Sequence, residues 1–234
     1  MASPTDNLQP VNFGILLFPA FQALDVFGPL DALNLLSMLK FPKMNLSIIG
    51  LTLDPISTKD PKGSSDFGES VVPTHTISDP PQDLDVLLVP GGLGSRDFEG
   101  TTPIVDFIRT IYPSLNQKAN GYLLTVCTGS WLAARAGVLD NKFATSNKAA
   151  WQEKKDKNIG PDVKWVSYAR WVVDGNIWTG SGVAAGIDLM VAFIEKVYGV
   201  ETANDISRLM EYMPHKDPHD DPFADLYGLP RENC

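Results

Sequence analysis

The stretch from Gly121 to Arg135, GYLLTVCTGSWLAAR, decides the fold class. It begins as an apolar run of strand length that ends at Cys127, and a helix-forming segment follows after small residues. A turn from strand to helix can present a nucleophile above a sheet. A helix N-terminus also favours a thiolate, so we expect a lowered pKa for the thiol. The alternative is a structural cysteine, because free cysteine is among the most buried residue types.

The segments on both sides of this stretch repeat the order of strand and helix. Strands are predicted at residues 11–18, 45–53, 84–89, 121–126, 163–166, 170–173 and 177–179, and helices at 24–39, 103–112, 128–136, 183–197 and 201–212. Nearly continuous apolar strands indicate a parallel sheet that is covered on both faces. The predicted fold class is therefore α/β: a three-layer, flavodoxin-like sandwich with a mostly parallel central sheet, helices on both faces and a nucleophile elbow.

Length and composition predict one domain. The chain has 234 residues, of which 44% are hydrophobic, enough for a sizeable core. Residues 1–10 are expected to be a short polar lead-in without the pattern of a signal peptide, and residues 11–212 the domain. Residues 213–234 read as a loop-like, Pro-rich tail, packed in part around residues 221–223.

Charge and cysteine content restrict the partners and the compartment. A net charge of −9 argues against nucleic acid and gives no basis for docking to an anionic membrane. No apolar run is long enough to span a membrane. The two cysteines, Cys127 and Cys234, make no disulfide framework, so we expect a reducing, cytoplasmic compartment.

Three chemically useful elements follow the carboxyl ends of predicted strands, where reactive groups of parallel sheets collect: Asp25, Gly91-Gly92 and Cys127. The glycine pair can offer backbone N–H groups to a developing anion together with Thr128, or it can be a plain turn. Asp25 is either a helix cap or first-turn charge, or a proton-handling carboxyl whose pKa is raised by burial.

The remaining patterns carry weaker signals. The elbow pattern Gly-x-nucleophile-x-Gly keeps only its second glycine, Gly129. No histidine has a zinc-like spacing with cysteine, so no metal site is expected. The tryptophans favour core or interface positions, although Trp151 and Trp178 can also line a pocket.

Several segments taken together resemble the ThiJ/PfpI superfamily, a class I glutamine amidotransferase-like group that includes the parkinsonism-associated deglycase. The resemblance covers about residues 11–225 and is carried by residues 15–19, 24–29, 85–92, 126–130, 136–140, 174–179, 181–189 and 221–223. Within the superfamily the chain looks most like the isocyanide hydratase branch. That branch has an Asp in Leu-Asp-x-x-Gly-Pro and a Cys-Thr-Gly turn, here residues 24–29 and 127–129.

The resemblance implies roles for individual residues. Cys127 would be the nucleophile and Asp25 the acid beside it, while Thr128 would supply a hydroxyl and a backbone donor and Gly92 a second backbone donor. The resemblance also implies a homodimer, a small-molecule substrate and no cofactor. The set of possible pocket residues is Gly91, Asn147, Trp151, Trp178 and Ser181.

Departures from the superfamily pattern reduce the number of reactions that we expect the protein to catalyse. Thr128 stands where peptidase-like members have His, and Asn147 stands where many relatives have a His in a Thr-Thr-His pattern. The deglycase and glyoxalase branch more often has Glu at the position of Asp25. The leading hypothesis is hydration of an isocyanide to an N-formamide through a Cys127 thioimidate. The alternatives are glyoxalase- or deglycase-like activity on α-oxoaldehydes and a non-catalytic redox sensor with an oxidisable thiol.

Overall fold

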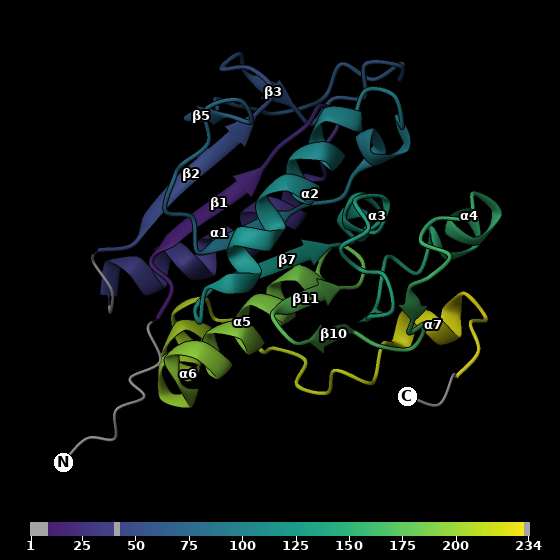
Figure 1. The fold of residues 1–234 in the computed structure, drawn as a ribbon. Coiled ribbons are helices and arrows are strands. Elements are labelled where there is room, and N and C mark those ends of the chain that lie inside the picture. The colour runs from purple at the N-terminus through teal and green to yellow at the C-terminus, as the bar shows by residue number, and fades with distance from the viewer. Residues whose placement is uncertain (1–8, 40–42, 232–234) are drawn as a thin grey trace.

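The computed structural model of the protein describes residues 9–39 and 43–231. Most of the predicted lead-in and Cys234 therefore lie outside the described residues. The central sheet has seven strands in the order β10-β11-β7-β6-β1-β2-β5 (Figure 1). These strands are β1 (Asn12–Leu16), β2 (Asn45–Gly50), β5 (His75–Thr76), β6 (Val86–Val89), β7 (Tyr122–Val126), β10 (Trp171–Asp174) and β11 (Ile177–Gly180).

All neighbouring strands of this sheet are parallel except the β10–β11 pair. That hairpin turns at Gly175, whose φ of 63° is readily adopted by glycine. Two small sheets lie outside the central one, β3 (Ile56–Ser57) with β4 (Ser70–Val71) and β8 (Phe143–Ala144) with β9 (Lys164–Trp165).

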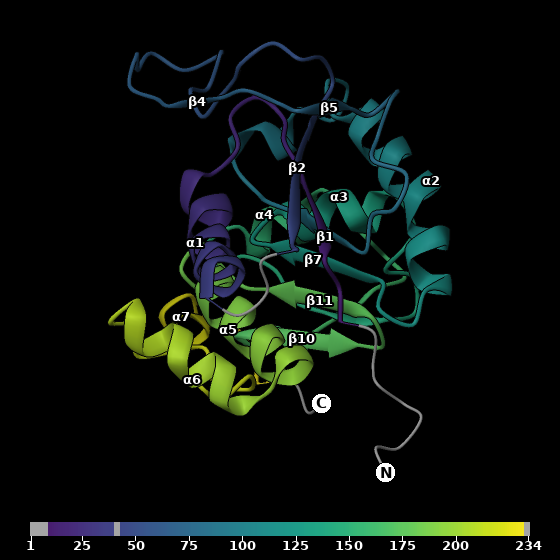
Figure 2. The same cartoon turned by 90° about the vertical axis from the view of Figure 1, so that its left-hand side faces the viewer.

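Helices cover both faces of the central sheet (Figure 2). One layer contains α1 (Ala23–Leu39), α5 (Ala185–Tyr198) and α6 (Val200–Leu209), which contact one another, and the other contains α2 (Thr102–Gln117) and α3 (Gly129–Arg135). Short elements complete the fold: η1 (Leu93–Arg96), α4 (Trp151–Asp156) and α7 (Pro222–Leu226). The predicted three-layer α/β class with a mostly parallel sheet is confirmed.

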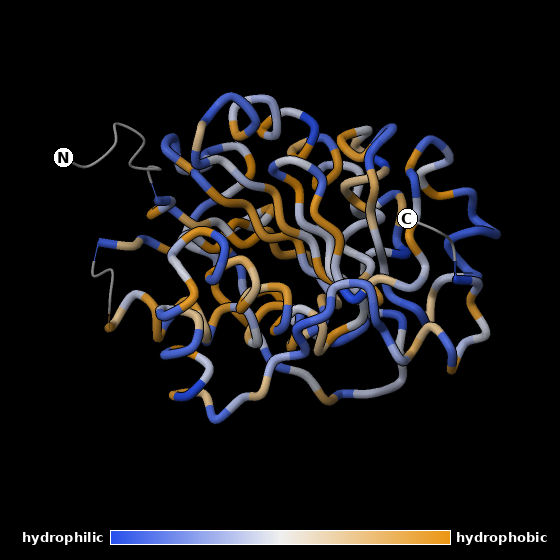
Figure 3. The backbone as a smooth tube through the Cα atoms, turned by 90° about the horizontal axis from the view of Figure 1, so that it is seen from below, coloured by the Kyte–Doolittle hydropathy of each residue, from blue (hydrophilic) through white to orange (hydrophobic). Residues whose placement is uncertain are grey.

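The central strands are buried on both faces, which explains their continuous apolar sequences. All four residues of β6 (VLLV) are buried, and four of the five in β7 are buried as well. Figure 3 shows the hydrophobic colour gathered in these strands and the hydrophilic colour in the outer loops. Among the described residues, no helix is both long and apolar enough to cross a membrane.

The strand order brings the carboxyl ends of β1, β6 and β7 together at the middle of the sheet. The chain runs from β1 to β2 on one side and then returns to β6 on the other side of β1. Such a reversal leaves a crevice outside the strand ends, which is where ligands of open α/β sheets bind.

Several predicted boundaries were wrong for local reasons. Helix α2 continues through Pro113 to Gln117, because a proline inside a helix removes one hydrogen bond without necessarily ending it. The tail is not loop throughout: Asp221 accepts a hydrogen bond from the Phe223 N–H, and Pro222 occupies the first position of α7. Residues 163–166 contribute β9 to a small sheet rather than to the central one.

Candidate active site

Cys127 occupies the sharp turn between β7 and α3, with a φ of 59° that is uncommon for any residue except glycine. Its N–H donates to the carbonyl oxygens of Gly180 (3.1 Å) and Ser181 (2.8 Å). Its own carbonyl accepts the Ser130 hydroxyl at 2.9 Å. These bonds hold the backbone in a left-handed conformation that it would otherwise avoid.

Two glycines allow the turn after β6 to lie directly against the cysteine turn. A Cβ on Gly129 would lie 2.2 Å from the Val89 carbonyl oxygen, and one on Gly91 would lie 2.5 Å from the Thr128 nitrogen. Any side chain at these positions would push the two turns apart. The retained second glycine of the elbow pattern is therefore a steric requirement of the close approach.

Three N–H groups face the Cys127 sulfur. Asn147 Nδ2 lies 3.1 Å from Sγ, and the backbone N–H groups of Thr128 and Val183 also hydrogen bond to the thiol. The Asn147 amide is oriented by its own oxygen, which accepts the Ala150 N–H at 2.9 Å. The nitrogen of that amide must then face the sulfur.

Val183 is a site residue that the sequence reasoning missed. Its φ of 39° is strained for a β-branched side chain, a conformation that costs on the order of 1–3 kcal/mol. The neighbouring Gly182 leaves room for Asn147, since a Cβ there would lie 2.8 Å from Nδ2. The segment Ser181-Gly-Val contributed to the family resemblance, but no sequence pattern signals that this backbone N–H reaches the thiol.

Asp25 is a fully buried carboxyl at the start of α1 and not a solvated first-turn charge. Its Oδ2 accepts the Gly91 N–H at 2.9 Å, whereas Oδ1 has no partner of hydrogen-bonding geometry in the described part of the chain. Burial raises the pKa of Asp25 to about 7, although the Gly91 N–H and the Cys127 thiol both lower it. This carboxyl can therefore give or take a proton near neutral pH.

The predicted lowering of the thiol pKa is wrong for the unliganded protein. Cys127 is only 6% exposed, and burial together with the negative charge of Asp25 raises the pKa of the thiol to about 12. The three N–H donors act in the opposite direction but do not outweigh burial. Because the two groups interact, the first proton to leave belongs to the Asp25–Cys127 pair as a whole.

The predicted donor role of Gly92 also needs correction. The Gly92 N–H donates to Thr128 Oγ1 at 3.1 Å, and the same hydroxyl oxygen accepts the Ser95 hydroxyl at 2.8 Å. The N–H of Gly91 is bound to Asp25. Of the two predicted backbone donors, only the Thr128 N–H hydrogen bonds to the sulfur. The Thr128 hydroxyl instead accepts hydrogen bonds from Gly92 and Ser95.

This arrangement makes the Thr128 hydroxyl important for stability. Thr128→Val leaves the buried Gly92 N–H without its acceptor and removes one of the two acceptors of the Ser95 hydroxyl, so we expect the free energy of unfolding to fall by about 1–3 kcal/mol. Urea denaturation followed by circular dichroism measures the difference, and Thr128→Ser, which keeps the hydroxyl, serves as the matched control. Equal stability of the Val variant and the native protein would show that these bonds contribute nothing.

Asn147 and Val183, which both hydrogen bond to the sulfur, also line a pocket of about 310 Å³, although Cys127 itself is not among its lining residues. The remaining lining residues are Lys148, Ala149, Ser181, Gly182, Ala184, Phe223 and Tyr227. We call it the thiol pocket. It includes Asn147 and Ser181 from the predicted set but not Gly91, whose N–H binds the Asp25 carboxyl.

The two tryptophans predicted as possible pocket walls belong to the core. Trp178 packs edge-to-face against Phe193 of α5, with ring centroids 5.5 Å apart. Trp151 is 2% exposed and packs against Trp165 and the Lys154 ammonium group. Both side chains therefore occupy the core positions that the sequence favoured, and neither lines the thiol pocket.

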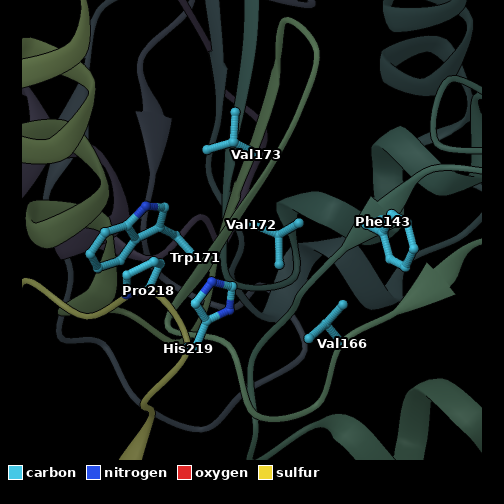
Figure 4. A pocket seen from close by; sticks show the side chains of 7 residues that line it. All are labelled: Phe143, Val166, Trp171, Val172, Val173, Pro218 and His219. Atoms are coloured by element: carbon cyan, nitrogen blue, oxygen red, sulfur yellow. The ribbon is translucent and has the colours of Figure 1, made fainter. Parts of the chain in front are cut away.

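A second pocket, also of about 310 Å³, lies beside the β10–β11 hairpin and shares no lining residue with the thiol pocket (Figure 4). Its walls are Phe143, Val166, Trp171, Val172, Val173, Pro218 and His219. His219 is its one titratable side chain. Within residues 9–39 and 43–231, no cluster of three or more His, Cys, Asp or Glu side chains could hold a metal ion.

The chain is similar in sequence to known proteins. The chain is 34% identical over 206 residues to an isonitrile hydratase from Pseudomonas putida, covering 87% of this chain and 79% of that protein. It is 28% identical over 217 residues to the HTH-type transcriptional regulator GbdR of Pseudomonas aeruginosa, covering 89% of this chain but only 53% of the regulator.

Among solved structures, a ThiJ/PfpI family protein from Pseudomonas syringae superposes with a TM-score of 0.71 at 26% identity, covering 95% of this chain and 83% of that one. The sequence profile of the DJ-1/PfpI family matches residues 13–196, which include Asp25, Cys127 and Val183. The match extends over well more than half of the sequence, and the chain therefore belongs to the DJ-1/PfpI family.

Proposed function

We propose that this protein adds water to isocyanides and releases N-formamides. The observation that carries the proposal is the pairing of a buried Cys127 thiol with a buried Asp25 whose pKa lies near 7, with Asn147 rather than His on the sulfur. The 34% identity to an isonitrile hydratase supports the same chemistry.

In the first step the sulfur adds to the terminal carbon of the isocyanide. The carboxylate of Asp25 takes the thiol proton as the carbon–sulfur bond forms, and then returns this proton to the same carbon. The product is a thioimidate, R–N=CH–S–Cys127. The former isocyanide carbon has gained one bond to hydrogen and one to sulfur, and the step needs no external oxidant or reductant. The three N–H groups at the sulfur stabilise the negative charge during attack.

In the second step water adds to the thioimidate carbon. Asp25 accepts a proton from the water and passes this proton to the nitrogen, and the tetrahedral adduct R–NH–CH(OH)–S–Cys127 forms. Collapse breaks the carbon–sulfur bond, returns a proton to the thiol and releases R–NH–CHO. One carboxyl that alternates between acid and base is sufficient, and none of the three histidines hydrogen bonds to Cys127 or Asp25.

The direct test is an assay of the purified protein with cyclohexyl isocyanide, with N-cyclohexylformamide followed by chromatography. We expect formamide production well above the rate in buffer. Formamide production no faster than in buffer, at all pH values from 6 to 9, would overturn the proposal.

The pH dependence follows from the raised pKa of Asp25. Below about pH 7 both groups of the pair are protonated and no base is available, whereas above it the carboxylate can accept the thiol proton. We therefore expect kcat/KM to rise with pH, with a midpoint near 7, and then to reach a plateau. A profile that is flat between pH 5.5 and 8.5 would contradict this assignment.

The redox-sensing alternative assumed an exposed thiol with a low pKa. Cys127 is instead buried, and its pKa is raised. The α-oxoaldehyde alternative requires proton movement between adjacent carbons, and Asn147, which contacts the sulfur, cannot carry protons near neutral pH. No contact in the site favours either alternative over isocyanide hydration.

A further inference from the structure

One wall of the thiol pocket comes from the C-terminal segment. Phe223 and Tyr227 of this segment line the pocket, opposite the segments 147–149 and 181–184 that hold the thiol. Each aromatic side chain is 49% exposed. Two half-exposed aromatic residues, Phe223 on the five-residue helix α7 and Tyr227 directly after it, therefore line the pocket.

The segment that carries these rings is fixed to the active-site loop by a buried charge cluster. Asp221, fully buried at the N-terminus of α7, lies 3.7 Å from Lys148 Nζ and 3.6 Å from Arg170. The Lys148 ammonium also donates to Thr145 Oγ1 and to the Ala169 carbonyl, both at 2.7 Å. Lys148 follows Asn147 directly in the sequence. The ion pair of Lys148 with Asp221 therefore joins the segment that carries the two rings to the segment that holds the Asn147 amide against the sulfur.

The pocket offers apolar contact and no unpaired charge. Ala149, Val183, Ala184 and the two rings supply its apolar surface. Lys148 is the one charged side chain among its walls, and its ammonium is already surrounded by acceptors and by Asp221. A charged substituent would lose its hydration there without gaining a partner, which is costly. The volume of about 310 Å³ lies at the low end of the range for small-molecule sites.

We propose that the thiol pocket receives the nitrogen substituent of the isocyanide, and that Phe223 and Tyr227 select bulky uncharged substituents, cyclic or aromatic, over small or charged ones. This inference rests on the proposed function. The two rings act on binding and not on bond making, because neither belongs to the groups that hydrogen bond to Cys127 or Asp25. Their effect should therefore be on KM.

The first experiment compares cyclohexyl isocyanide with methyl isocyanide in Phe223→Ala, Tyr227→Ala and the double variant. We expect the ratio of kcat/KM values, cyclohexyl over methyl, to fall by about 10-fold or more in the double variant, mainly through a higher KM for the bulky substrate. Leu226→Ala is the matched control, since Leu226 is 70% exposed on the same helix and does not line the pocket. An unchanged ratio in the double variant would overturn the proposal.

A second measurement separates this inference from the proposed reaction. Intact-protein mass spectrometry gives the rates at which chloroacetamide and N-benzyl chloroacetamide alkylate Cys127. We expect the benzyl reagent to lose its relative advantage in the double variant and to keep it in Leu226→Ala. If the benzyl reagent loses its advantage in this way but the native protein does not hydrate isocyanides, the hydratase function is refuted and the assignment of the pocket is retained. Identical reagent ratios in all variants would refute the pocket assignment, whether or not isocyanides are hydrated.

Discussion

Replacing Cys127 by Ala should lower kcat for isocyanide hydration by about 10⁴-fold or more, to the level of buffer. The sulfur forms the covalent bond to the substrate in the proposed reaction, and no other nucleophile lies in its place. Among the described residues, Cys127 is the free cysteine. The measurement is formamide production under saturating substrate, with protein concentration raised until a rate or an upper limit is obtained.

The control must show that the site is otherwise intact. The Cys127 side chain is small and its backbone bonds to Gly180 and Ser181 do not involve the sulfur. The Ala variant should therefore unfold at a urea concentration close to that of the native protein. Cys127→Ser keeps a hydroxyl at this position and should be nearly as inactive, because an alcohol is a far weaker nucleophile than a thiol. A folded Ala variant that retains a tenth of native activity would exclude covalent catalysis by this residue.

Replacing Asp25 by Asn should lower kcat by about 10²- to 10⁴-fold, the usual contribution of a positioned acid or base. The amide oxygen can still accept the Gly91 N–H, so the geometry is kept while proton transfer is lost. The rising limb of the pH profile near 7 should disappear as well, because that limb is the titration of this carboxyl.

The same variant should make the thiol easier to ionise. The charge of Asp25 is one of the two causes that raise the pKa of Cys127, and its removal lowers that pKa, although burial continues to raise it. We therefore expect iodoacetamide to alkylate Asp25→Asn faster than the native protein at pH 8 while turnover collapses. Asp31→Asn, an exposed position on the same helix, is the control. Slower alkylation and slower turnover together would indicate a distorted site rather than a lost acid.

Local sequence patterns were sufficient to predict the sheet and the elements that meet at its edge. Continuous apolar strands predicted the parallel sheet, and the carboxyl ends of β1, β6 and β7 predicted that Asp25, Gly91 and Cys127 would meet. The structure places the turn after β6 between the other two, with the Gly91 N–H on the Asp25 carboxyl and its Cα against the cysteine turn. Alternating strands and helices were enough to predict this arrangement.

The parts that sequence could not predict depend on contacts between distant segments. The direction of the thiol pKa shift is set by burial, which local sequence does not report, and the Val183 N–H reaches the sulfur only because of an unusual φ. The position of Phe223 and Tyr227 depends on the ion pairs of Asp221 with Lys148 and Arg170, which are far apart in sequence. Homodimer formation and a cytoplasmic location remain predictions.

Rapid-quench mass spectrometry can detect the covalent intermediate on Cys127 that the proposed reaction requires. Native protein is mixed with excess cyclohexyl isocyanide, stopped in acid within the first turnover, digested and searched for the modified peptide. We expect the peptide containing Cys127 to gain the mass of one isocyanide molecule, and this species to decay as formamide appears once substrate is exhausted. Formamide production with no such adduct at any time, in a protein whose Cys127→Ala variant turns over equally fast, would contradict this expectation.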